Sequence, residues 1–271
     1  MTHATPFLSR IADDRRRRVA EMKLATPPHV LRARLRSRRE GGRLERALRR
    51  GGPARALKLL CEVKRASPSK GMLHESVDPV ALARVYEAGG AAAISLVTEP
   101  DHFKGDLAWI DSVRPVVAIP LLLKDFVIDS YQLLDAAVRG ADGVLLLASL
   151  LSETEMQRLI GEAKVLGLDP LVEVHTLEEL NATLRAGATL VGINHRNLHT
   201  FELDMSLSAR LLPLIPSIVT AVAESGLSLP EELARLRATR CDAVLMGEVF
   251  VTSADPAATL AVLAAAARGD A

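Results

Sequence analysis

The sequence predicts a (β/α)8 barrel, the TIM-barrel architecture, with an N-terminal helical extension. Short apolar runs alternate with amphipathic helical patterns eight times between Leu57 and the end of the chain. Such alternation produces parallel β-α-β units, and eight units in about 215 residues fit the size of this barrel. Polar residues follow nearly every run, at the strand ends where this barrel builds its site.

The expected strands are runs of leucine, valine, isoleucine and alanine, each bounded by a turn or a polar residue. Continuous apolar runs of this length are typical of strands that are buried on both faces, as in a parallel sheet. The eight runs cover residues 57–63, 92–97, 121–124, 143–147, 169–174, 190–194, 218–223 and 243–246.

Helical patterns follow these runs, with recognisable signals at their ends. Asp78, followed by proline, predicts an N-cap, while Ser152 with Glu155 and Thr176 with Glu179 predict capping boxes. Glycines at positions 89, 90, 140, 167 and 187 are expected to end helices. The helices are expected over residues 79–88, 106–113, 129–139, 153–166, 177–186, 206–212, 229–238 and 256–268.

A doubly wound sheet is the alternative architecture. Its first strand is usually followed by a glycine-rich turn that binds a dinucleotide. Residues 65–71 (RASPSKG), which follow the first expected strand here, do not have that pattern. We therefore expect a single domain in which residues 51–271 form the barrel. Residues 1–50 precede the first strand and are expected to form helices that cap one end of the barrel.

Composition indicates a soluble cytoplasmic protein with an aliphatic core. Hydrophobic residues make up 49% of the chain but aromatic residues only 3%. Cys61 and Cys241 are far apart without metal-type spacing, so we expect reduced, buried thiols and no metal site. The N-terminus lacks the apolar segment of a signal peptide, and no apolar run approaches the length of a membrane span.

Charge is unevenly distributed although the net charge is only +1. Residues 1–50 hold 15 basic and five acidic residues, whereas residues 51–271 hold 19 basic and 28 acidic ones. A nucleic-acid-binding arm is one interpretation of this basic start. Helical apolar spacing and the lack of interleaved aromatic residues favour solvated faces of N-terminal helices, some of whose charges meet the acidic remainder. The basic groups are residues 15–18 and Arg32, Arg34, Arg36, Arg38 and Arg39.

Two opposite charges sit at the end of the first expected strand. Glu62 and Lys64 are two residues apart, so in a strand they face the same side. Burying such a pair is costly unless each charge has a partner or a function. The turn that follows, Ser67 to Gly71, is expected to be a mobile lid over a site.

Charged and amide side chains end the other strands as well. In a barrel of this kind they converge on one mouth, while the apolar end of the fourth strand, near Leu146 and Leu147, offers a wall. Small residues at Ser225, Gly226 and Gly247 let backbone amides approach an anion, and loops seven and eight often bind phosphate in this fold. The converging side chains are Glu62, Lys64, Lys124, Glu173, Asn194 and Glu224.

The ordered strand ends resemble those of the indole-3-glycerol-phosphate synthase family of tryptophan biosynthesis. The resemblance runs from the first strand to the last, and the Arg-rich start fits the family's extension in place. It is carried by residues 62–71 (EVKRASPSKG), 98–100 and 103–105 (TEP, FKG), 124–126 (KDF), 131–132 (YQ), 140–142 (GAD), 171–175 (LVEVH), 192–198 (GINHRNL), 224–226 (ESG) and 247–248 (GE).

The resemblance implies a carbon–carbon lyase that acts on 1-(2-carboxyphenylamino)-1-deoxyribulose 5-phosphate. The aromatic carbon that bears the carboxylate attacks the sugar ketone, and carbon dioxide and then water leave, without a metal or organic cofactor. By resemblance Lys124 is the general acid, Glu173 and Glu62 serve acid–base steps, Lys64 assists the second proton transfer or binds phosphate, and Asn194 orients the substrate.

The resemblance also implies the groups that hold the substrate. The partner is a small phosphorylated molecule, not nucleic acid or membrane, and a monomer is the working expectation. The substrate-binding residues are Ser67, Phe103, Phe126, Arg196, Glu224 and Ser225. The phosphate-binding residues are Lys64, Gly226, Gly247 and Glu248.

Three positions depart from the family pattern. Asp106 stands where serine is frequent, which changes the contacts of the second loop. His195 fills a position often held by asparagine or serine, and its ring is expected to point to solvent. Val249 replaces a frequent serine, so phosphate binding there would depend on backbone amides.

Other functions are also compatible with these residues. A Schiff-base aldolase would use Lys124 or Lys64 as its nucleophile. A sugar-phosphate isomerase would need a Cys or His paired with Asp on opposite strands, and such a pair is not evident. A non-catalytic anion or nucleic-acid binder, acting through the Arg-rich start, is the alternative of another class.

Overall fold

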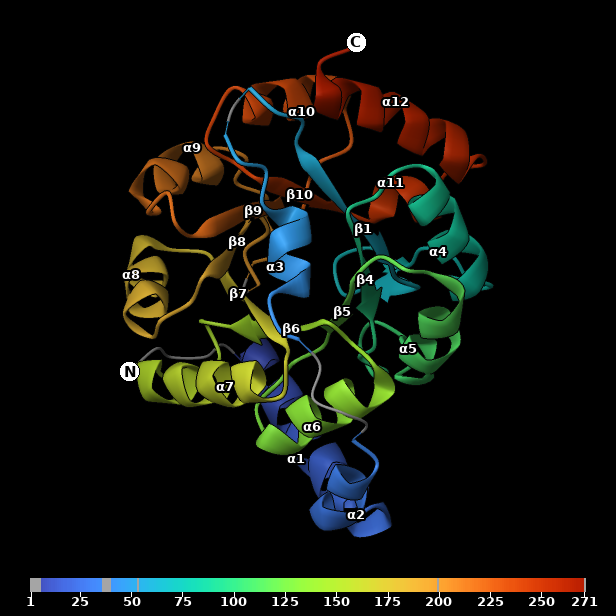
Figure 1. Cartoon of the computed structure of the whole chain (residues 1–271), viewed down its shortest axis with the longest axis vertical. Helices are drawn as coiled ribbons and strands as arrows, with labels where there is room; N and C mark the ends of the chain where they lie inside the picture. Colours follow the sequence, from blue (N-terminus) through green and yellow to red (C-terminus); the bar gives the residue numbers. More distant parts are fainter. Residues whose placement is uncertain (1–5, 36–39, 53, 199, 271) are drawn as a thin grey trace.

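The computed structural model describes residues 6–35, 40–52, 54–198 and 200–270, and it contains a closed barrel of eight parallel strands (Figure 1). Going round the barrel, the strands follow the order β1, β10, β9, β8, β7, β6, β5 and β4, and every neighbouring pair is parallel. The predicted (β/α)8 barrel is confirmed. Because the sheet closes on itself, a doubly wound open sheet is excluded. No helix in the described part of the chain has the length and apolarity needed to cross a membrane.

Five expected strands have the boundaries that the sequence predicts, and the others differ by one or two residues. β9 begins later than expected because Ile218 is exposed at the barrel rim, where its carbonyl accepts a hydrogen bond from Arg49. The barrel strands are β1 (Lys58–Val63), β4 (Ala93–Val97), β5 (Leu121–Lys124), β6 (Gly143–Leu147), β7 (Asp169–Val174), β8 (Leu190–Asn194), β9 (Thr220–Glu224) and β10 (Ala243–Met246).

Helices follow the strands as predicted and cover the outside of the barrel (Figure 1). Asp78 caps the first of them, and Ser152 and Glu155 form the expected capping box. Thr176 also caps its helix, but Glu179 accepts from His175 N and not from Thr176 N. The helices are α4 (Pro79–Ala88), α5 (Ala108–Val113), α6 (Ser130–Arg139), α7 (Glu153–Val165), α8 (Leu177–Arg185), α9 (Leu207–Leu211), α10 (Pro230–Arg237) and α12 (Pro256–Arg268).

A short hairpin and a single helical turn near the cleft were not expected from the sequence. β2 (Ala66–Ser67) pairs with β3 (Gly71–Met72), so the turn after β1 is a hairpin. A single helical turn, α11 (Glu248–Val251), follows β10 directly. Both are too short to show a repeating hydrophobic pattern, and both lie at the end of the barrel where the strands finish.

Successive side chains of each strand alternate between the outside and the inside of the barrel, which gives two separate apolar layers. Side chains that face outward pack under the helices, whereas those that face inward fill the barrel axis. The inward face of β1 carries Leu60 and then Glu62, and that of β7 carries Leu171 and then Glu173. The barrel interior is therefore aliphatic along most of its length and becomes charged only where the strands end.

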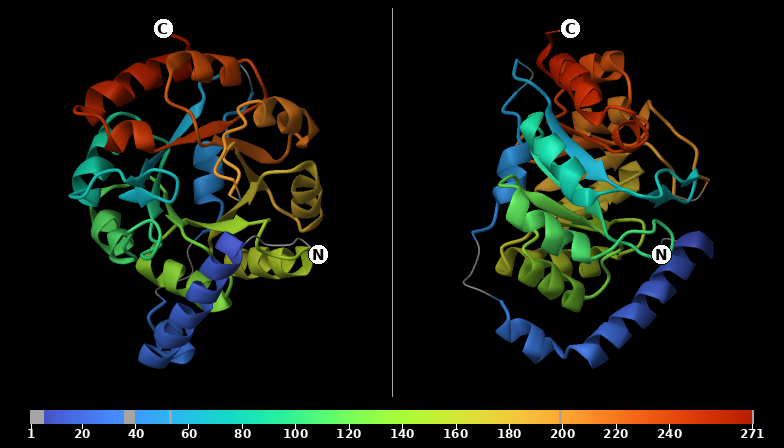
Figure 2. Two further views of the ribbon diagram at one scale, coloured as in Figure 1. Left: turned by 180° about the vertical axis from the view of Figure 1, so that it is seen from behind. Right: turned by 90° about the vertical axis from the view of Figure 1, so that its right-hand side faces the viewer.

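The N-terminal extension contacts both ends of the barrel, which corrects the prediction that it caps one end. α1 (Pro6–Ala25) crosses the end where the strands finish, α2 (Pro28–Ala33) packs on α6, and α3 (Arg43–Leu48) closes the opposite end (Figure 2). Leu44 of α3 fits against Gly143, where a β-carbon would lie 2.4 Å from it. Leu8 and Ile11 of α1 are fully buried at the other end.

Some basic residues of the extension meet acidic residues of the barrel, as predicted. Arg15 and Asp125 form an almost fully buried ion pair at 3.1 Å, and Arg18 pairs with Asp101 at 2.5 Å. Lys23 pairs with Asp129 at 2.7 Å. Arg36, Arg38 and Arg39 of the basic series lie outside the described residues.

Candidate active site

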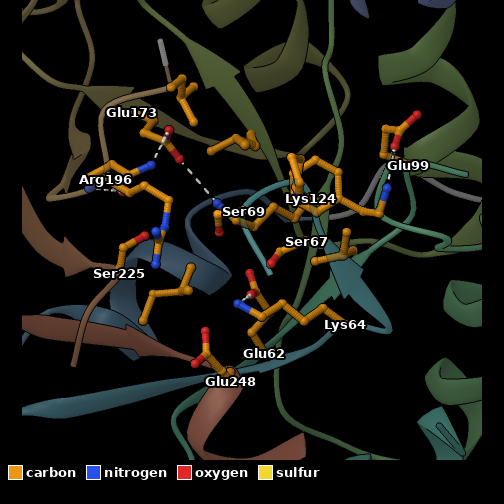
Figure 3. A pocket seen from close by; sticks show the side chains of 18 of the residues that line it. Glu62, Lys64, Ser67, Ser69, Glu99, Lys124, Glu173, Arg196, Ser225 and Glu248 are labelled. Carbon is orange, nitrogen blue, oxygen red and sulfur yellow. Dashed lines mark hydrogen bonds and ion pairs between the residues drawn. The ribbon is translucent and has the colours of Figure 1, made fainter. Parts of the chain in front are cut away.

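The strand ends form a cleft that contains nearly all the predicted site residues (Figure 3). Its open space is about 1050 Å³ with the mouth included, enough for a ligand with a ring, a sugar and a phosphate. Glu224 lies just beneath the lining and contacts it through Lys124. The predicted residues in the lining are Glu62, Lys64, Ser67, Phe103, Lys124, Phe126, Glu173, Asn194, Arg196, Ser225, Gly226, Gly247 and Glu248.

Glu62 and Lys64 face the same side of β1, as their spacing predicts. Lys64 Nζ lies 3.1 Å from Glu62 Oε1, and Glu62 is 3% exposed. The neighbouring strand makes room for the carboxylate, because a β-carbon on Gly247 would lie 2.8 Å from Glu62 Cβ and 2.9 Å from Glu62 Oε1. The glycine at the end of β10 is therefore required by the side chain at the end of β1.

Lys124 lies between two buried carboxylates. Its Nζ is 3.2 Å from Glu173 Oε2 and 3.2 Å from Glu224 Oε2. Burial alone lowers the pKa of Lys124, but the negative charges of Glu224, Glu173 and Glu62 outweigh it and raise the pKa above its ordinary value. The side chain is a protonated ammonium at neutral pH, which is the form a proton donor needs.

The two carboxylates around Lys124 differ in acidity. Burial raises the pKa of Glu224 to about 7, the charge of Glu173 adds to this shift, and Lys124 opposes it. Burial also disfavours ionised Glu173, yet Lys124 and the contact with His175 lower its pKa well below the ordinary range. Two acids whose pKa values separate in this way are suited to different proton-transfer roles.

Glu173 is held by groups on three sides. Besides Lys124, Asn194 donates from Nδ2 to Glu173 Oε1 at 2.8 Å, and His175 Nε2 lies 3.4 Å from the same oxygen. Burial opposes protonation of His175, but Glu173 and Glu179 raise its pKa to about 9. His175 was not among the predicted site residues, although it stands two positions after Glu173 and so shares its side of the strand.

The cleft has an apolar side. The rings of Phe103 and Phe126 lie with centroids 6.0 Å apart, and Leu145 and Leu147 of β6 complete the wall. The apolar fourth strand thus forms the expected wall, with one correction: Leu146 faces outward, because neighbouring strand residues alternate. Phe7 of α1 and Phe201 also line the cleft, in edge contact with centroids 5.1 Å apart, and the sequence pattern did not indicate either.

The opposite side of the cleft is suited to an anion. Ser225 and Gly226 have φ values of 67° and 73°, so two left-handed residues follow each other after β9. Within the described chain, the backbone N–H groups of Gly226 and Gly247 have no intramolecular acceptor. Glu248 also lines this side, but its carboxylate pairs with Lys70 at 2.5 Å, which leaves only its backbone N–H for an anion.

Arg196 and Ser67 have different surroundings at the cleft edge. Arg196 donates from Nη1 to Phe201 O at 3.0 Å and from its backbone N to Asn194 Oδ1 at 2.9 Å, so it braces the loop after β8. Ser67 Oγ is buried in the wall and has no hydrogen-bond partner within the described residues. The same is true of Glu224 Oε1. Ser67 lines the cleft, whereas Glu224 Oε1 lies beneath the lining, beside Gly192.

The three departures from the family pattern have definite positions. His195 does not point to solvent: the residue is 2% exposed and its ring lies between Ser225 and Ser208, which corrects the prediction. Asp106 accepts from Ala108 N at 2.8 Å, outside the cleft lining, and so steadies the start of α5. Val249 lies in α11 and packs against the apolar core, so it offers no donor to the cleft.

The arrangement is suited to acid–base chemistry beside an aromatic-lined wall and an anion site. The raised pKa of Lys124 argues against a Schiff-base role, which requires an unprotonated amine. Cys61 faces outward under the helices, and burial raises its pKa, so it supplies no isomerase base. In the described part of the chain no cluster of His, Cys, Asp or Glu has the geometry of a metal site.

Solved structures of other proteins have the same fold. Two solved structures share the fold alone: KGPDC from Streptococcus mutans has a TM-score of 0.62 at 13% identity, covering 79% of this chain and 99% of that chain. The 3-hexulose-6-phosphate synthase from Salmonella typhimurium has a TM-score of 0.59 at 15% identity, covering 78% and 98%.

Sequence relatives are much closer. The indole-3-glycerol phosphate synthase of Sulfurimonas denitrificans is 46% identical over 208 residues, covering 77% of this chain and 79% of its own. That of Campylobacter hominis is 50% identical over 204 residues, covering 75% and 78%. The family model for indole-3-glycerol phosphate synthase matches residues 8–263. The chain therefore belongs to the indole-3-glycerol phosphate synthase family.

Proposed function

We propose that this chain converts 1-(2-carboxyphenylamino)-1-deoxyribulose 5-phosphate to indole-3-glycerol phosphate in tryptophan biosynthesis. One observation supports this most strongly: Lys124 is a protonated ammonium held between two carboxylates at the centre of the cleft. Ring closure on a ketone needs a proton donor at the developing alkoxide, and this ammonium is that donor.

In the first step the aromatic carbon that carries the carboxylate attacks the sugar ketone. The new carbon–carbon bond forms as the carbonyl π bond breaks, and Lys124 gives its proton to the oxygen. The aromatic carboxylate then leaves as carbon dioxide, and the electron pair of its broken bond restores the aromatic ring. Glu173 and Glu224 flank the lysine and supply the charge that keeps it protonated before attack.

The last step removes water. The hydroxyl formed in ring closure leaves as water with a donated proton, and the adjacent ring CH2 carbon loses a proton. The electron pair of that broken C–H bond forms the carbon–carbon double bond of the indole, whose nitrogen keeps its hydrogen. Glu173 and Glu62 are the proposed carboxylates for these proton transfers, and Lys64, 3.1 Å from Glu62, is the proposed second proton donor. Neighbouring groups of this kind titrate as a set, so the roles belong to the cluster as well as to its members.

The cleft also has a place for each end of the substrate. Phe103 and Phe126 would hold the anthranilate ring, while Ser225 and the backbone amides of Gly226, Gly247 and Glu248 would hold the phosphate, with Lys64 adding charge. Ser67, whose Oγ has no hydrogen-bond partner among the described residues, is the proposed contact to the sugar hydroxyls. Glu224 would act on the substrate through Lys124, which it contacts at 3.2 Å. Asn194 would orient the substrate through its fixed amide, and Arg196 would keep the loop after β8 in place.

We further propose that residues 1–50 are part of a single domain with the barrel, and that the protein is a cytoplasmic monomer that does not bind nucleic acid. The ion pairs of Arg15, Arg18 and Lys23 with barrel carboxylates support an intramolecular use of the basic charge.

Product analysis tests the proposal against its nearest alternative. Incubation with the anthranilate-bearing substrate should release one carbon dioxide for each indole formed. Treatment with borohydride during turnover should leave the protein mass unchanged, because no imine is formed. A borohydride-stable adduct on Lys124 or Lys64, without carbon dioxide release, would support the aldolase instead.

A further inference from the structure

His195 is a buried side chain that touches the wall of the cleft from behind. It follows Asn194 at the end of β8, and its backbone N donates to Glu224 O at 3.0 Å while its carbonyl accepts from Asp204 N at 2.8 Å. Nδ1 of the ring lies 2.9 Å from Ser225 O, and Nε2 lies 2.6 Å from Ser208 Oγ. The ring therefore joins the β9 loop to α9, although it does not line the cleft.

The two partners fix which ring nitrogen carries the proton. A backbone carbonyl only accepts hydrogen bonds, so Nδ1 must be the donor to Ser225 O. In the neutral ring Nε2 then accepts from the hydroxyl of Ser208. Burial lowers the pKa of His195, which agrees with a neutral ring in this tautomer.

The hydrogen bond to Ser225 controls a peptide in an unusual conformation. Ser225 has a φ of 67°, a left-handed value that non-glycine residues adopt only when their surroundings hold them there. Its carbonyl and the N–H of Gly226 belong to one planar trans peptide and point in opposite directions. A carbonyl drawn toward His195 therefore turns the N–H of Gly226 away from His195, on the side of the cleft that both residues line.

We propose that His195 is a positioning residue for phosphate binding: its Nδ1–H fixes the Ser225–Gly226 peptide so that the N–H of Gly226 faces the phosphate. The inference rests on the proposed function, since it assigns the anion side of the cleft to the substrate phosphate. Within the described residues, that N–H has no acceptor, which is what a preorganised anion donor requires. A side chain at Gly226 would be strained, because its φ of 73° is a left-handed value and a β-carbon would also lie 2.7 Å from Met205 Sδ.

Two substitutions separate this role from a merely structural one. The amide N–H of asparagine can occupy the place of Nδ1, whereas glutamine reaches only to the place of Nε2. His195→Asn keeps the bond to Ser225, and His195→Gln keeps the contact with Ser208. Ser208→Ala is the matched control, because it removes the second contact and leaves the first.

Steady-state kinetics and inorganic phosphate binding are the readouts, with thermal melts to establish that each variant is folded. Losing one hydrogen bond to a charged phosphate weakens binding roughly tenfold or more. His195→Gln should raise KM and the phosphate Kd by that factor with kcat little changed. His195→Asn and Ser208→Ala should stay within about threefold of the wild type, even if their melting temperatures fall. Equal effects of His195→Asn and His195→Gln on phosphate binding, or no effect of either, would overturn the proposal.

A measurement on the unaltered protein covers the case of a variant that does not fold. The amide proton of Gly226 should shift downfield when inorganic phosphate is added, as a hydrogen bond forms, and an unmoved Gly226 signal at saturating phosphate would overturn the inference. Phosphate binding is independent of turnover. A wild-type protein that binds phosphate at Gly226 but forms no indole would therefore defeat the proposed function and leave the positioning role intact.

Discussion

The carboxyl group of Glu224 occupies the space that a side chain at Gly192 would fill. A β-carbon on Gly192 would lie 2.0 Å from Glu224 Oε1, and Glu224 in turn contacts Lys124 at 3.2 Å. Glu62 and Gly247 have the same relationship on another pair of neighbouring strands. Each of these two buried carboxylates is therefore accommodated by a glycine on the next strand.

Gly192→Ala should reduce kcat roughly a hundredfold, the usual result of moving a reacting group by about an ångström. The added methyl group displaces Glu224 and with it Lys124, while overpacking costs stability by about 1–3 kcal/mol. Gly161→Ala is the control, because nothing lies within 4 Å of its β-carbon position on α7. A Gly192→Ala protein with the wild-type kcat would show that Glu224 has no part in turnover.

Stability should fall between pH 6.5 and pH 9 because of His175. Its pKa rises from 6.5 to about 9 on folding, so in this range the folded state binds more protons than the unfolded state. The stabilisation is fully present below pH 6.5 and is lost as the pH rises through 9. Urea unfolding at the two pH values should differ by on the order of 2–3 kcal/mol, and His175→Gln should remove most of that difference. An unchanged pH dependence in the variant would exclude His175 as its source.

Removing Arg15 should loosen the N-terminal extension. The guanidinium is buried against Asp125, with the two charged groups 3.1 Å apart. Loss of one partner of a buried ion pair lowers the free energy of unfolding by about 3–5 kcal/mol. Protonation of Asp125 would reduce this loss. Arg15→Ala should lower the urea midpoint and speed amide exchange in α1. Arg17→Ala, which removes an exposed pair with Asp14, is the control. Equal midpoints for the two variants would argue that the extension is not integrated with the barrel.

The hairpin of β2 and β3 is the proposed lid. Lys70 at its tip pairs with Glu248 across the cleft mouth at 2.5 Å, and Ser67 and Ser69 line the cleft beneath it (Figure 3). Amide exchange at residues 67–71 should slow when substrate is added to an inactive Lys124→Ala protein, while exchange in α12 stays constant. Equal exchange at residues 67–71 with and without bound substrate would mean that the hairpin is a static connection.

Much of the barrel and its site was predictable, because both depend on alternation within short segments. Inward and outward positions follow from the two-residue period of a strand, which is why Glu62 and Lys64 were correctly placed on one side. The strand ends of a closed barrel must converge, so residues far apart in sequence could be assigned to one cleft. These inferences needed no knowledge of how the loops fold.

The predictions that were wrong concern features that depend on contacts between residues far apart in the sequence. Whether the N-terminal extension covers one end of the barrel or both depends on contacts such as those of Leu8 and Ile11 of α1 with the cleft end, which no local pattern contains. His195 was expected in solvent because its partners, Ser225 and Ser208, come from separate segments. The buried carboxylate of Glu99 accepts three backbone N–H groups of its own loop, a structural role that its position after a strand did not reveal.

The most direct test of the account is indole fluorescence after 1-(2-carboxyphenylamino)-1-deoxyribulose 5-phosphate is added to the purified protein. The wild type should form indole-3-glycerol phosphate. Lys124→Ala should lose turnover by a factor of about 10²–10⁴, the usual value of one general acid, with its fold and phosphate binding retained. Lys164→Ala, on the exposed face of α7, should match the wild type. No product from folded wild-type protein, or a Lys124→Ala rate close to that of the wild type, would contradict the account.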